Sequence, residues 1–506
     1  MEHGADITIK DSNKKTALFD AYKIRNEHLV KYLLELGADI NKEDNEGETP
    51  LFIACYEGHE NIIKCLVEYG ADINKENNDS ETPLLMACDK GNEDLIRYLV
   101  EHGADITIKN SNKRTALFYA CKSGNEHLVK YLVDKGVDIN KRDNDGYFPL
   151  LIACYEGYEN IVKYLIKHGA DITIKYRSER TALFYACENG NEHLVRYLVD
   201  KGADINKQDN DGNFPLLIAC YEGHENIVKY LVKHGADINK GNNKGETPLF
   251  IACSRKHDNI VRYLVEHGAD INKENIISSL IFGAWDKRHE NIVRCLVEHG
   301  ANIKINTIYN DWSPLFTAFN NKNYDLVRYL IENGADINRK NVNGKILLSN
   351  ACWCENEHLV KYLIEHGADI NTQDDYYYSP LFIATSKGND TIEKYLVEKG
   401  ADINIQNYKG ATPLFIACYK GHENIVRYLV EHGADINKQD NNGKTPLFNA
   451  VKKGYENVIK YLVEKGANVN KQNNDGITPL LILRDKGHEN MINYLIEHRV
   501  VKKRKI

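Results

Sequence analysis

A cysteine and a histidine stand four positions apart, with a glycine between them, at three places in the chain: Cys55 and His59, Cys220 and His224, and Cys418 and His422. A thiol next to an imidazole can form a nucleophile and its base. In each copy, however, a glycine that is expected to end a helix separates the two partners. The sequence also contains no H-E-x-x-H, phosphate-binding glycine loop or G-x-S-x-G motif. We therefore predict that the protein is not an enzyme and has no catalytic residues.

The twelve cysteines could instead indicate a metal site or disulfides. Seven of them follow one another at a constant 33-residue spacing: Cys55, Cys88, Cys121, Cys154, Cys187, Cys220 and Cys253. If each lies on an equivalent helix, neighbours are roughly 8 to 10 Å apart, beyond the roughly 7 Å Cα separation that a disulfide allows. Cys352 and Cys354 form a lone C-x-C without two further ligands nearby. We expect reduced core thiols, no metal and no cofactor.

The same spacing organises the whole chain. The triplet Gly-Ala-Asp, or a near copy, recurs in steps of 33 from Gly4 to Gly466, with one step of 32 and one of 34 on either side of Gly300. A repeat of this length indicates an array of stacked units, because one unit cannot bury its own apolar face. We predict a partial repeat end at 1–4, fifteen repeats at 5–37, 38–70, 71–103, 104–136, 137–169, 170–202, 203–235, 236–268, 269–300, 301–334, 335–367, 368–400, 401–433, 434–466 and 467–499, and a basic tail at 500–506.

The unit 401–433 shows what each repeat should contain. Thr412 followed by Pro413 predicts a helix start, since the hydroxyl can cap free amides and proline suits the first turn. Gly421 permits the left-handed residue that ends this first helix. A second helix should begin near Glu423, and the polar segment between units suits a tight hairpin turn. Each unit is therefore predicted to be helix, turn, helix and hairpin.

These residues, with Thr-Pro-Leu-Phe, the Ala-Cys pair, Gly-His and Gly-Ala-Asp-Ile-Asn in the 33-residue unit, resemble the ankyrin repeat. The resemblance implies an all-α fold: a curved single array of helix-turn-helix units with projecting hairpin loops. In one departure, Phe or Leu replaces the family's histidine after Thr-Pro-Leu, as at Phe52, Phe250 and Phe415. The composition also resembles that of ankyrin proteins from giant amoeba-infecting DNA viruses.

The composition limits the class of partner. The chain has 27% charged residues and a net charge of -8, which is typical of a soluble protein and argues against a general nucleic-acid binder. It has neither an apolar run long enough to cross a membrane nor an apolar signal core at its start. We expect an intracellular, cytoplasmic monomer that binds protein partners. The tail sequence KKRK at 502–505 leaves a nuclear location open.

Departures from the repeat concentrate in its eighth to twelfth units. The glycine that ends the first helix is replaced four times in succession, by Lys256, Arg288, Lys322 and Glu355. Large apolar residues replace hairpin residues such as Asn-Asp-Gly, and all three tryptophans lie in repeats 9 to 11. We predict a partner-binding surface at Ile276, Ile277, Tyr309, Trp312, Trp353, Tyr376, Tyr377, Tyr378 and Tyr408. The alternative is that this segment has drifted and its hairpin tips pack on one another.

A second asymmetry concerns charge in the two residues before the helix-ending glycine. Acidic residues prevail there in repeats 2 to 7, as at Glu57, Glu156 and Glu222, whereas basic residues prevail in repeats 8 to 15. The predicted basic rim comprises Arg255, Lys287, Lys387, Lys420, Lys452, Lys453 and Lys486. This sign change predicts an acidic ligand segment toward the C-terminal half. The alternative is a set of mixed, solvated surfaces.

The sequence supports one leading function and leaves others open. The leading function is a non-catalytic scaffold or adaptor that holds protein partners on its hairpins and concave face. The alternative is the substrate-recognition subunit of a ubiquitin ligase or another host-interaction factor, although only VVKKRKI follows Arg499 where an F-box-like segment would be expected. A third possibility, the regulatory arm of an enzyme or channel, needs a further domain, and the opening residues MEHG do resemble the tail of a second helix.

Overall fold

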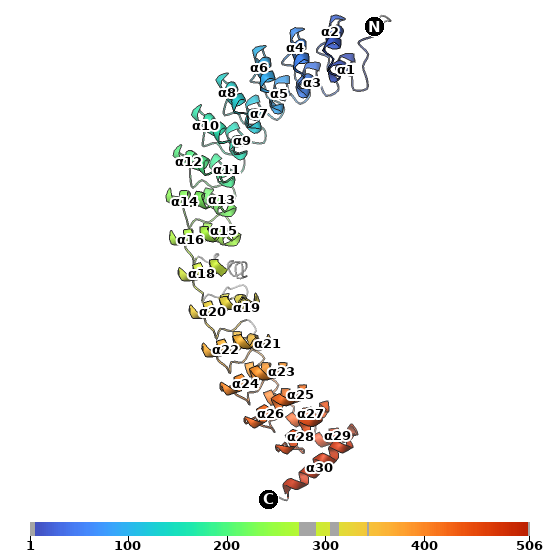
Figure 1. Ribbon diagram of the computed structural model, residues 1–506, viewed down its shortest axis with the longest axis vertical. Coiled ribbons are helices and arrows are strands. Elements are labelled where there is room, and N and C mark those ends of the chain that lie inside the picture. Colours follow the sequence, from blue (N-terminus) through green and yellow to red (C-terminus); the bar gives the residue numbers. More distant parts are fainter. Residues whose placement is uncertain (1–5, 273–289, 304–312, 342–343, 504–506) are drawn as a thin grey trace. The chain divides into compact units, whose positions relative to one another are not determined.

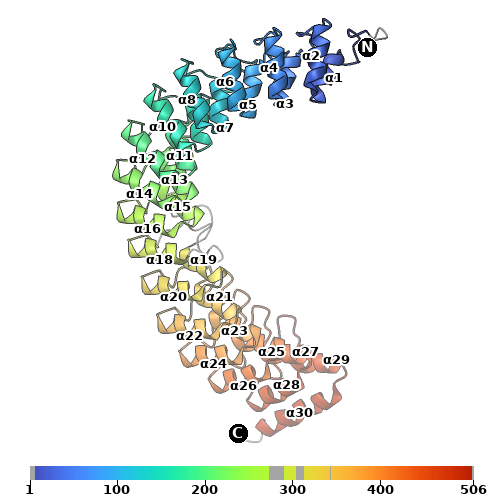
Figure 2. The same cartoon turned by 45° about the horizontal axis from the view of Figure 1, so that its top comes forward.

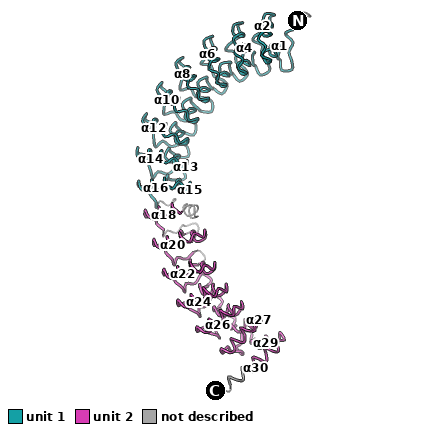
Figure 3. The backbone as a smooth tube through the Cα atoms, viewed as in Figure 1, with its two compact units in different colours: residues 1–276 teal, residues 277–506 magenta. Residues whose placement is uncertain are grey.

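The computed structural model describes residues 6–272, 290–303, 313–341 and 344–503. Within these ranges the regular elements are α-helices, accompanied by one isolated antiparallel bridge between Lys175 and Thr181. The helices fall into two compact units, residues 1–276 and residues 277–506 (Figure 3). This confirms the all-α repeat array that the sequence predicts.

Unit 1 contains α1 (Ala17–Lys23), α2 (Glu27–Glu35), α3 (Pro50–Glu57), α4 (Glu60–Glu68), α5 (Pro83–Lys90), α6 (Glu93–Glu101), α7 (Ala116–Ser123), α8 (Glu126–Asp134), α9 (Pro149–Tyr155), α10 (Glu159–Lys167), α11 (Ala182–Glu188), α12 (Glu192–Asp200), α13 (Pro215–Glu222), α14 (Glu225–Lys233), α15 (Pro248–Arg255) and α16 (Asp258–Glu266). Unit 2 contains α18 (Glu290–Glu298), α19 (Pro314–Asn320), α20 (Tyr324–Glu332), α21 (Leu347–Trp353), α22 (Glu357–Glu365), α23 (Pro380–Lys387), α24 (Asp390–Glu398), α25 (Pro413–Lys420), α26 (Glu423–Glu431), α27 (Pro446–Lys453), α28 (Glu456–Glu464), α29 (Pro479–Asp485) and α30 (Glu489–Lys503).

The local signals in the sequence place these helices correctly. At α25 the hydroxyl of Thr412 accepts a hydrogen bond from the backbone N–H of Phe415 at 3.2 Å, and Pro413 is the first helical residue. Gly421 follows in the left-handed region with φ 79°, and α26 begins at Glu423. The cap, the proline and the glycine therefore do what the sequence predicts for them.

Within each unit the helices form two rows (Figures 1 and 2). The odd-numbered helices, which come first in each pair, pack on one another, as α3 does on α5 and α25 on α27. The even-numbered helices form the other row, as α2 does with α4 and α26 with α28. We call these the first-helix row and the second-helix row. Side chains on the first-helix row of one repeat can therefore reach those of the next.

The space between the two rows is filled by apolar side chains and cysteines. All twelve cysteines are free thiols, and each is buried except Cys354. Burial raises the pKa of the Cys55, Cys220 and Cys418 thiols above the ordinary range for cysteine. A thiol that is harder to ionise is a poorer nucleophile and metal ligand. These cysteines are part of the core, as predicted.

The first helices that lack their terminal glycine still end in the same backbone conformation. Lys256, Lys322 and Glu355 have φ values of 66°, 58° and 57°. For residues with a Cβ atom the left-handed conformation costs about 1 kcal/mol each. The fourth replacement, Arg288, lies outside the described residues. In these repeats the turn between the first and second helices keeps its left-handed backbone, although the residue there is not glycine and the conformation costs energy.

Within the described residues no helix combines the length and the apolar character needed to cross a membrane.

Candidate interaction surface

At one of the Cys-His pairs that the sequence singles out, Cys220 and His224, the imidazole contacts the preceding repeat. Cys220 is buried, and the Nε2 atom of His224 lies 3.2 Å from the backbone carbonyl of Glu188 in the preceding repeat. The imidazole thus serves the packing between repeats. Among the described residues, no group of three or more His, Cys, Asp or Glu side chains is placed to hold a metal ion.

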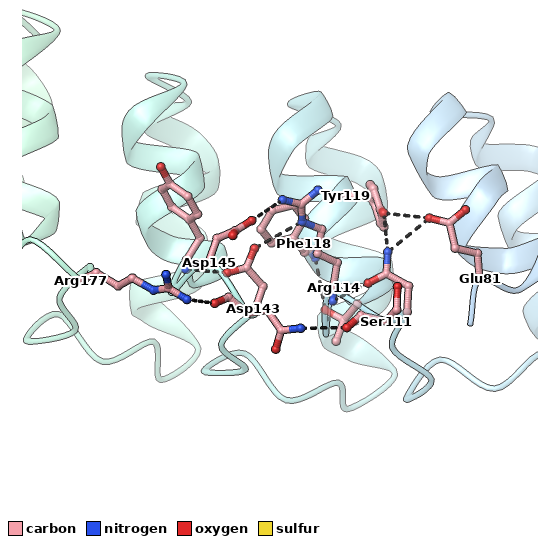
Figure 4. Close-up of polar contacts among 12 residues, drawn as sticks. Glu81, Ser111, Arg114, Phe118, Tyr119, Asp143, Asp145 and Arg177 are labelled. Carbon is pink, nitrogen blue, oxygen red and sulfur yellow. Dashed lines mark hydrogen bonds and ion pairs between the residues drawn. The ribbon is translucent and has the colours of Figure 1, made fainter. Parts of the chain in front are cut away.

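Polar side chains hold neighbouring hairpins in register (Figure 4). The guanidinium of Arg114 lies 3.3 Å from a carboxylate oxygen of Asp143 and 2.9 Å from one of Asp145, both in the next hairpin. Asparagine side chains at one hairpin position add a second link, since each donates to the backbone carbonyl 33 residues earlier: Asn45, Asn78, Asn144, Asn210, Asn243, Asn441 and Asn474. We call this set the asparagine ladder. Its members explain the recurring polar hairpins without any partner.

The hairpin at Tyr376–Tyr378 retains the turn of the other hairpins but carries different side chains. A carboxylate oxygen of buried Asp374 accepts from the backbone N–H groups of Tyr376 and Tyr378, both at 2.9 Å. Tyr377 has φ 59°, the left-handed conformation that Gly344 and Gly410 adopt at the same position in neighbouring repeats. A tyrosine therefore occupies a strained position where glycine is the usual residue. A cavity of about 660 Å³ beside it is lined by Lys340 and Asp375, among others.

The aromatic rings of this hairpin lie against those of the next hairpin and of α23. The ring centres of Tyr376 and Tyr408 are 6.0 Å apart, and those of Tyr378 and Phe382 are 4.9 Å apart. Tyr408 stands at an asparagine-ladder position. Tyr378 is half-buried, and burial, followed by the nearby Tyr408, raises its pKa. Tyr376, Tyr377 and Tyr408 remain 57%, 57% and 46% exposed. The hairpin tips thus pack together in part, while three rings still face solvent.

Trp353 belongs to a different part of the repeat from these hairpins. It is the last residue of α21 and is 56% exposed. Four other exposed rings occupy the equivalent position in other repeats: Tyr56, Tyr155, Tyr221 and Tyr419. The sequence analysis did not single out these four tyrosines, because a residue that recurs at the repeat spacing indicates a structural role. We call the five residues the ring positions.

The other predicted contact residues Ile276, Ile277, Tyr309 and Trp312, and the rim residue Lys287, lie outside the described residues. Of the predicted surface, the structure therefore places Trp353 on a helix and Tyr376, Tyr377, Tyr378 and Tyr408 in two adjacent hairpins of unit 2. Trp353 and the Tyr376–Tyr378 hairpin belong to consecutive repeats, since α21 packs against α23, the helix that follows this hairpin.

A family model described as "Ankyrin repeats (3 copies)" matches residues 1–77, 21–110, 74–143, 138–209, 183–275, 279–341, 348–440, 381–473 and 436–505. The chain belongs to the ankyrin-repeat family. Ankyrin repeats are generally protein–protein interaction modules, so membership implies protein partners. No curated protein matched the chain as a relative.

Part of the predicted basic rim of this ankyrin array lies over the ring positions. In four cases a cation of the next repeat lies over one of these rings: Lys90 over Tyr56 at 4.0 Å, Arg255 over Tyr221 at 3.5 Å, Lys387 over Trp353 at 4.2 Å and Lys453 over Tyr419 at 4.4 Å, each measured to the ring centre. Such contacts are typical cation–π pairs. Three predicted rim residues are thus held against aromatic faces of the preceding ankyrin repeat.

In unit 1 the predicted change of charge coincides with a cavity. A space of about 650 Å³ between the first helices and the hairpins is lined by Glu188 and Glu222 of the acidic segment and by Arg255 of the basic one. Its floor includes Leu217 and Phe250. Phe250, which stands where the family has histidine, is only partly buried, whereas the equivalent Phe52 is 1% exposed. The phenylalanine that replaces the family's histidine is therefore fully packed in the core at Phe52 and only partly packed at Phe250.

Proposed function

We propose that the protein is a non-catalytic scaffold that binds a protein partner through exposed rings of unit 2, namely Trp353, Tyr376, Tyr377 and Tyr408. We call these four residues the aromatic surface. The observation that carries this proposal is Tyr377, an exposed tyrosine with φ 59° at a position that is glycine in the neighbouring repeats. Lys14, Ser80, Lys113 and Glu179 adopt the same conformation at this repeat position, so an exposed aromatic ring, and not the backbone alone, distinguishes Tyr377.

The surrounding side chains suit the role. Exposed aromatic residues that lie close together are characteristic of contact surfaces, where tyrosine and tryptophan contribute most of the binding energy. The rings of Tyr376 and Tyr408 lie 6.0 Å apart, so each restricts the other before a partner arrives. Restricted side chains lose less conformational entropy on binding. The cluster is best suited to contact an apolar surface on a partner protein, which binding would bury, and not an acidic substrate or a cofactor.

The remaining expectations from the sequence stay proposals: a monomer without enzymatic activity, with no affinity for nucleic acid, located in the cytoplasm. The likeness to viral ankyrin proteins suggests, as a further proposal, a partner from a host cell.

Affinity capture with the full chain tests the proposal. A Y376S/Y377S/Y408S variant should lose the proteins that the wild type enriches. The matched control is a Y32S/Y69S variant, because Tyr32 and Tyr69 are 45% and 43% exposed but lie at the second helices of unit 1. The control should retain the full set of captured proteins. Equal capture by the wild type and both variants would reject the proposed surface.

A further inference from the structure

Four lysines occupy a single repeat position in four consecutive repeats of unit 2. They are Lys387, Lys420, Lys453 and Lys486, which follow one another at the spacing of the 33-residue repeat. All four are exposed, and each stands directly before the left-handed glycine after a first helix or lies within that turn. Because consecutive first helices such as α25 and α27 pack on each other, the four side chains form one line along the first-helix row. We call them the lysine line.

Contacts within the protein fix the direction of three of these side chains. Lys387 and Lys453 lie over the rings of Trp353 and Tyr419. The ammonium group of Lys486 donates to the backbone carbonyl of Lys452 in the preceding repeat. Each of these lysines thus reaches back toward its neighbour, so the charges are held in place before anything binds.

The positive charge along this line is not neutralised by the chain itself. In the described part of unit 2, the ion pairs join side chains of second helices, as in Arg294 with Glu290 and Arg427 with Glu423. None of the four lysines is paired with a carboxylate among the described residues of the unit. Lys452, also exposed, adds a fifth charge to the same row, whereas Asp485 is the acidic residue at that position in the last repeat.

We propose that the lysine line binds an acidic polypeptide segment in an extended, polyproline-like conformation with a carboxylate at every third residue. Neighbouring helices in such arrays are spaced roughly 8 to 10 Å apart. A polyproline II helix rises about 3.1 Å per residue and returns to the same face every third residue, about 9.3 Å along its axis. One carboxylate per three residues therefore meets one lysine per repeat. The proposal rests on the proposed function only in that the array binds protein.

The two surfaces are distinct in chemistry and can fail separately. The aromatic surface offers apolar area, so its contribution should depend little on salt. The lysine line acts through charge, so its contribution should fall as ionic strength rises and shortens the Debye length from roughly 10 Å at 0.1 M. If the tyrosine variant loses its captured proteins, that result does not change the peptide binding expected of the lysine line.

Fluorescence anisotropy with the full chain and labelled synthetic peptides tests the line. The first peptide is a (Glu-Pro-Pro)4 sequence, and the second has the same composition with its four glutamates in one block. The wild type should bind the spaced peptide at least about tenfold more tightly. A K387E/K420E/K453E/K486E variant should bind it at least about 30-fold more weakly than the wild type, as expected for four lost exposed ion pairs.

The matched control variant carries the same charge change on lysines in, or directly after, second helices of the same unit, K361E/K394E/K399E/K460E. It should weaken binding less than about threefold if position and not net charge matters. Equal weakening in both variants, equal binding of both peptides, or no binding of either would overturn the proposal. Tighter binding of an oligothymidylate of the same length than of the spaced peptide would also overturn it in favour of nucleic acid. A shift of the wild type to a dimer without peptide would identify a second copy as the occupant instead.

Discussion

The ammonium nitrogen of Lys387 lies 4.2 Å from the ring centre of Trp353, although the two residues belong to different repeats. The relationship arises because the residue that precedes the left-handed turn of one repeat reaches back over the end of the first helix in the repeat before it. Tyr419 and Lys453 form the same contact two repeats further along the chain. Side chains on this surface are therefore held in place by contacts between residues of consecutive repeats.

The Trp353 and Lys387 pair should be measurable as a coupling energy. An exposed cation–π contact is worth about 0.5 to 1 kcal/mol. A double-mutant cycle with W353A, K387A and the double variant, measured by chemical denaturation of the full chain, should give a coupling of that size. The cycle for Trp353 and Lys420, which belong to repeats that are not adjacent, is the control. It should give a coupling close to zero.

Replacing Tyr377 by glycine should stabilise the protein. The left-handed conformation of Tyr377, φ 59°, costs about 1 kcal/mol that glycine does not. Chemical denaturation should therefore show a gain of about 1 kcal/mol in the free energy of unfolding for Y377G. The opposite is expected for G410A, because a Cβ atom on Gly410 would lie 2.4 Å from the side-chain oxygen of Asn441. A loss of stability in Y377G would show that the tyrosine ring contributes to folding more than its strain costs.

Glu393 is a buried carboxyl group in α24, where the equivalent residue in α26 is Val426. It is 0% exposed, and neither of its oxygens has a hydrogen-bond partner among the described residues. Burial, assisted by Asp390 and opposed by Lys394, raises its pKa from 4.5 to about 8. The folded state therefore favours the protonated form, whereas the unfolded chain ionises above pH 4.5.

The sign of the pH dependence follows from that difference. The stability associated with protonated Glu393 is fully present below pH 4.5 and is lost as the pH rises toward about 8, by up to about 1.4 kcal/mol per pH unit. Hydrogen exchange of α23 and α24 should thus become faster, relative to E393V, between about pH 5.5 and 8. Amides of α13 and α14 in unit 1 serve as the internal reference. A constant difference between wild type and E393V over this range would contradict the assignment.

Sequence reasoning could predict the elements of this fold because each has a local cause. Thr412 caps α25, Gly421 ends it, and the regular spacing of cysteines such as Cys55 and Cys88 marks the core. Contacts between repeats are harder to predict. That Lys387 lies over Trp353 depends on how far one repeat is rotated against the next, which no residue spacing specifies. For the same reason the sequence indicates a charged rim but not the rings beneath it.

The candidate surface is only partly visible in the sequence. Tyr376 and Tyr377 stand out because they depart from the repeat, and the structure places both at the surface. Tyr221 and Tyr419 do not stand out, because they recur in the repeat and recurrence by itself indicates a structural role. Their exposure of 44% and 40% shows that a recurring residue can also face solvent.

Thiol reactivity should separate the surface from the core. Cys354 is the single exposed cysteine among the twelve, and it follows Trp353 directly. The folded protein should release about one equivalent of chromophore from an aromatic disulfide reagent, and a C354S variant should release almost none. Full denaturation should expose all twelve thiols of the wild type. Rapid reaction of several thiols in the folded C354S variant would contradict the buried assignment.

Site-specific photocrosslinking tests most directly whether the aromatic surface binds a protein partner. A benzophenone amino acid is placed at position 376 in one protein and at position 442 in another, since Asn442 is the equivalent exposed hairpin residue two repeats later. Both proteins are irradiated under the conditions of affinity capture and compared by mass spectrometry. Position 376 should yield a crosslinked partner protein that is absent at position 442. The same products at both positions, or none at position 376, would contradict this prediction.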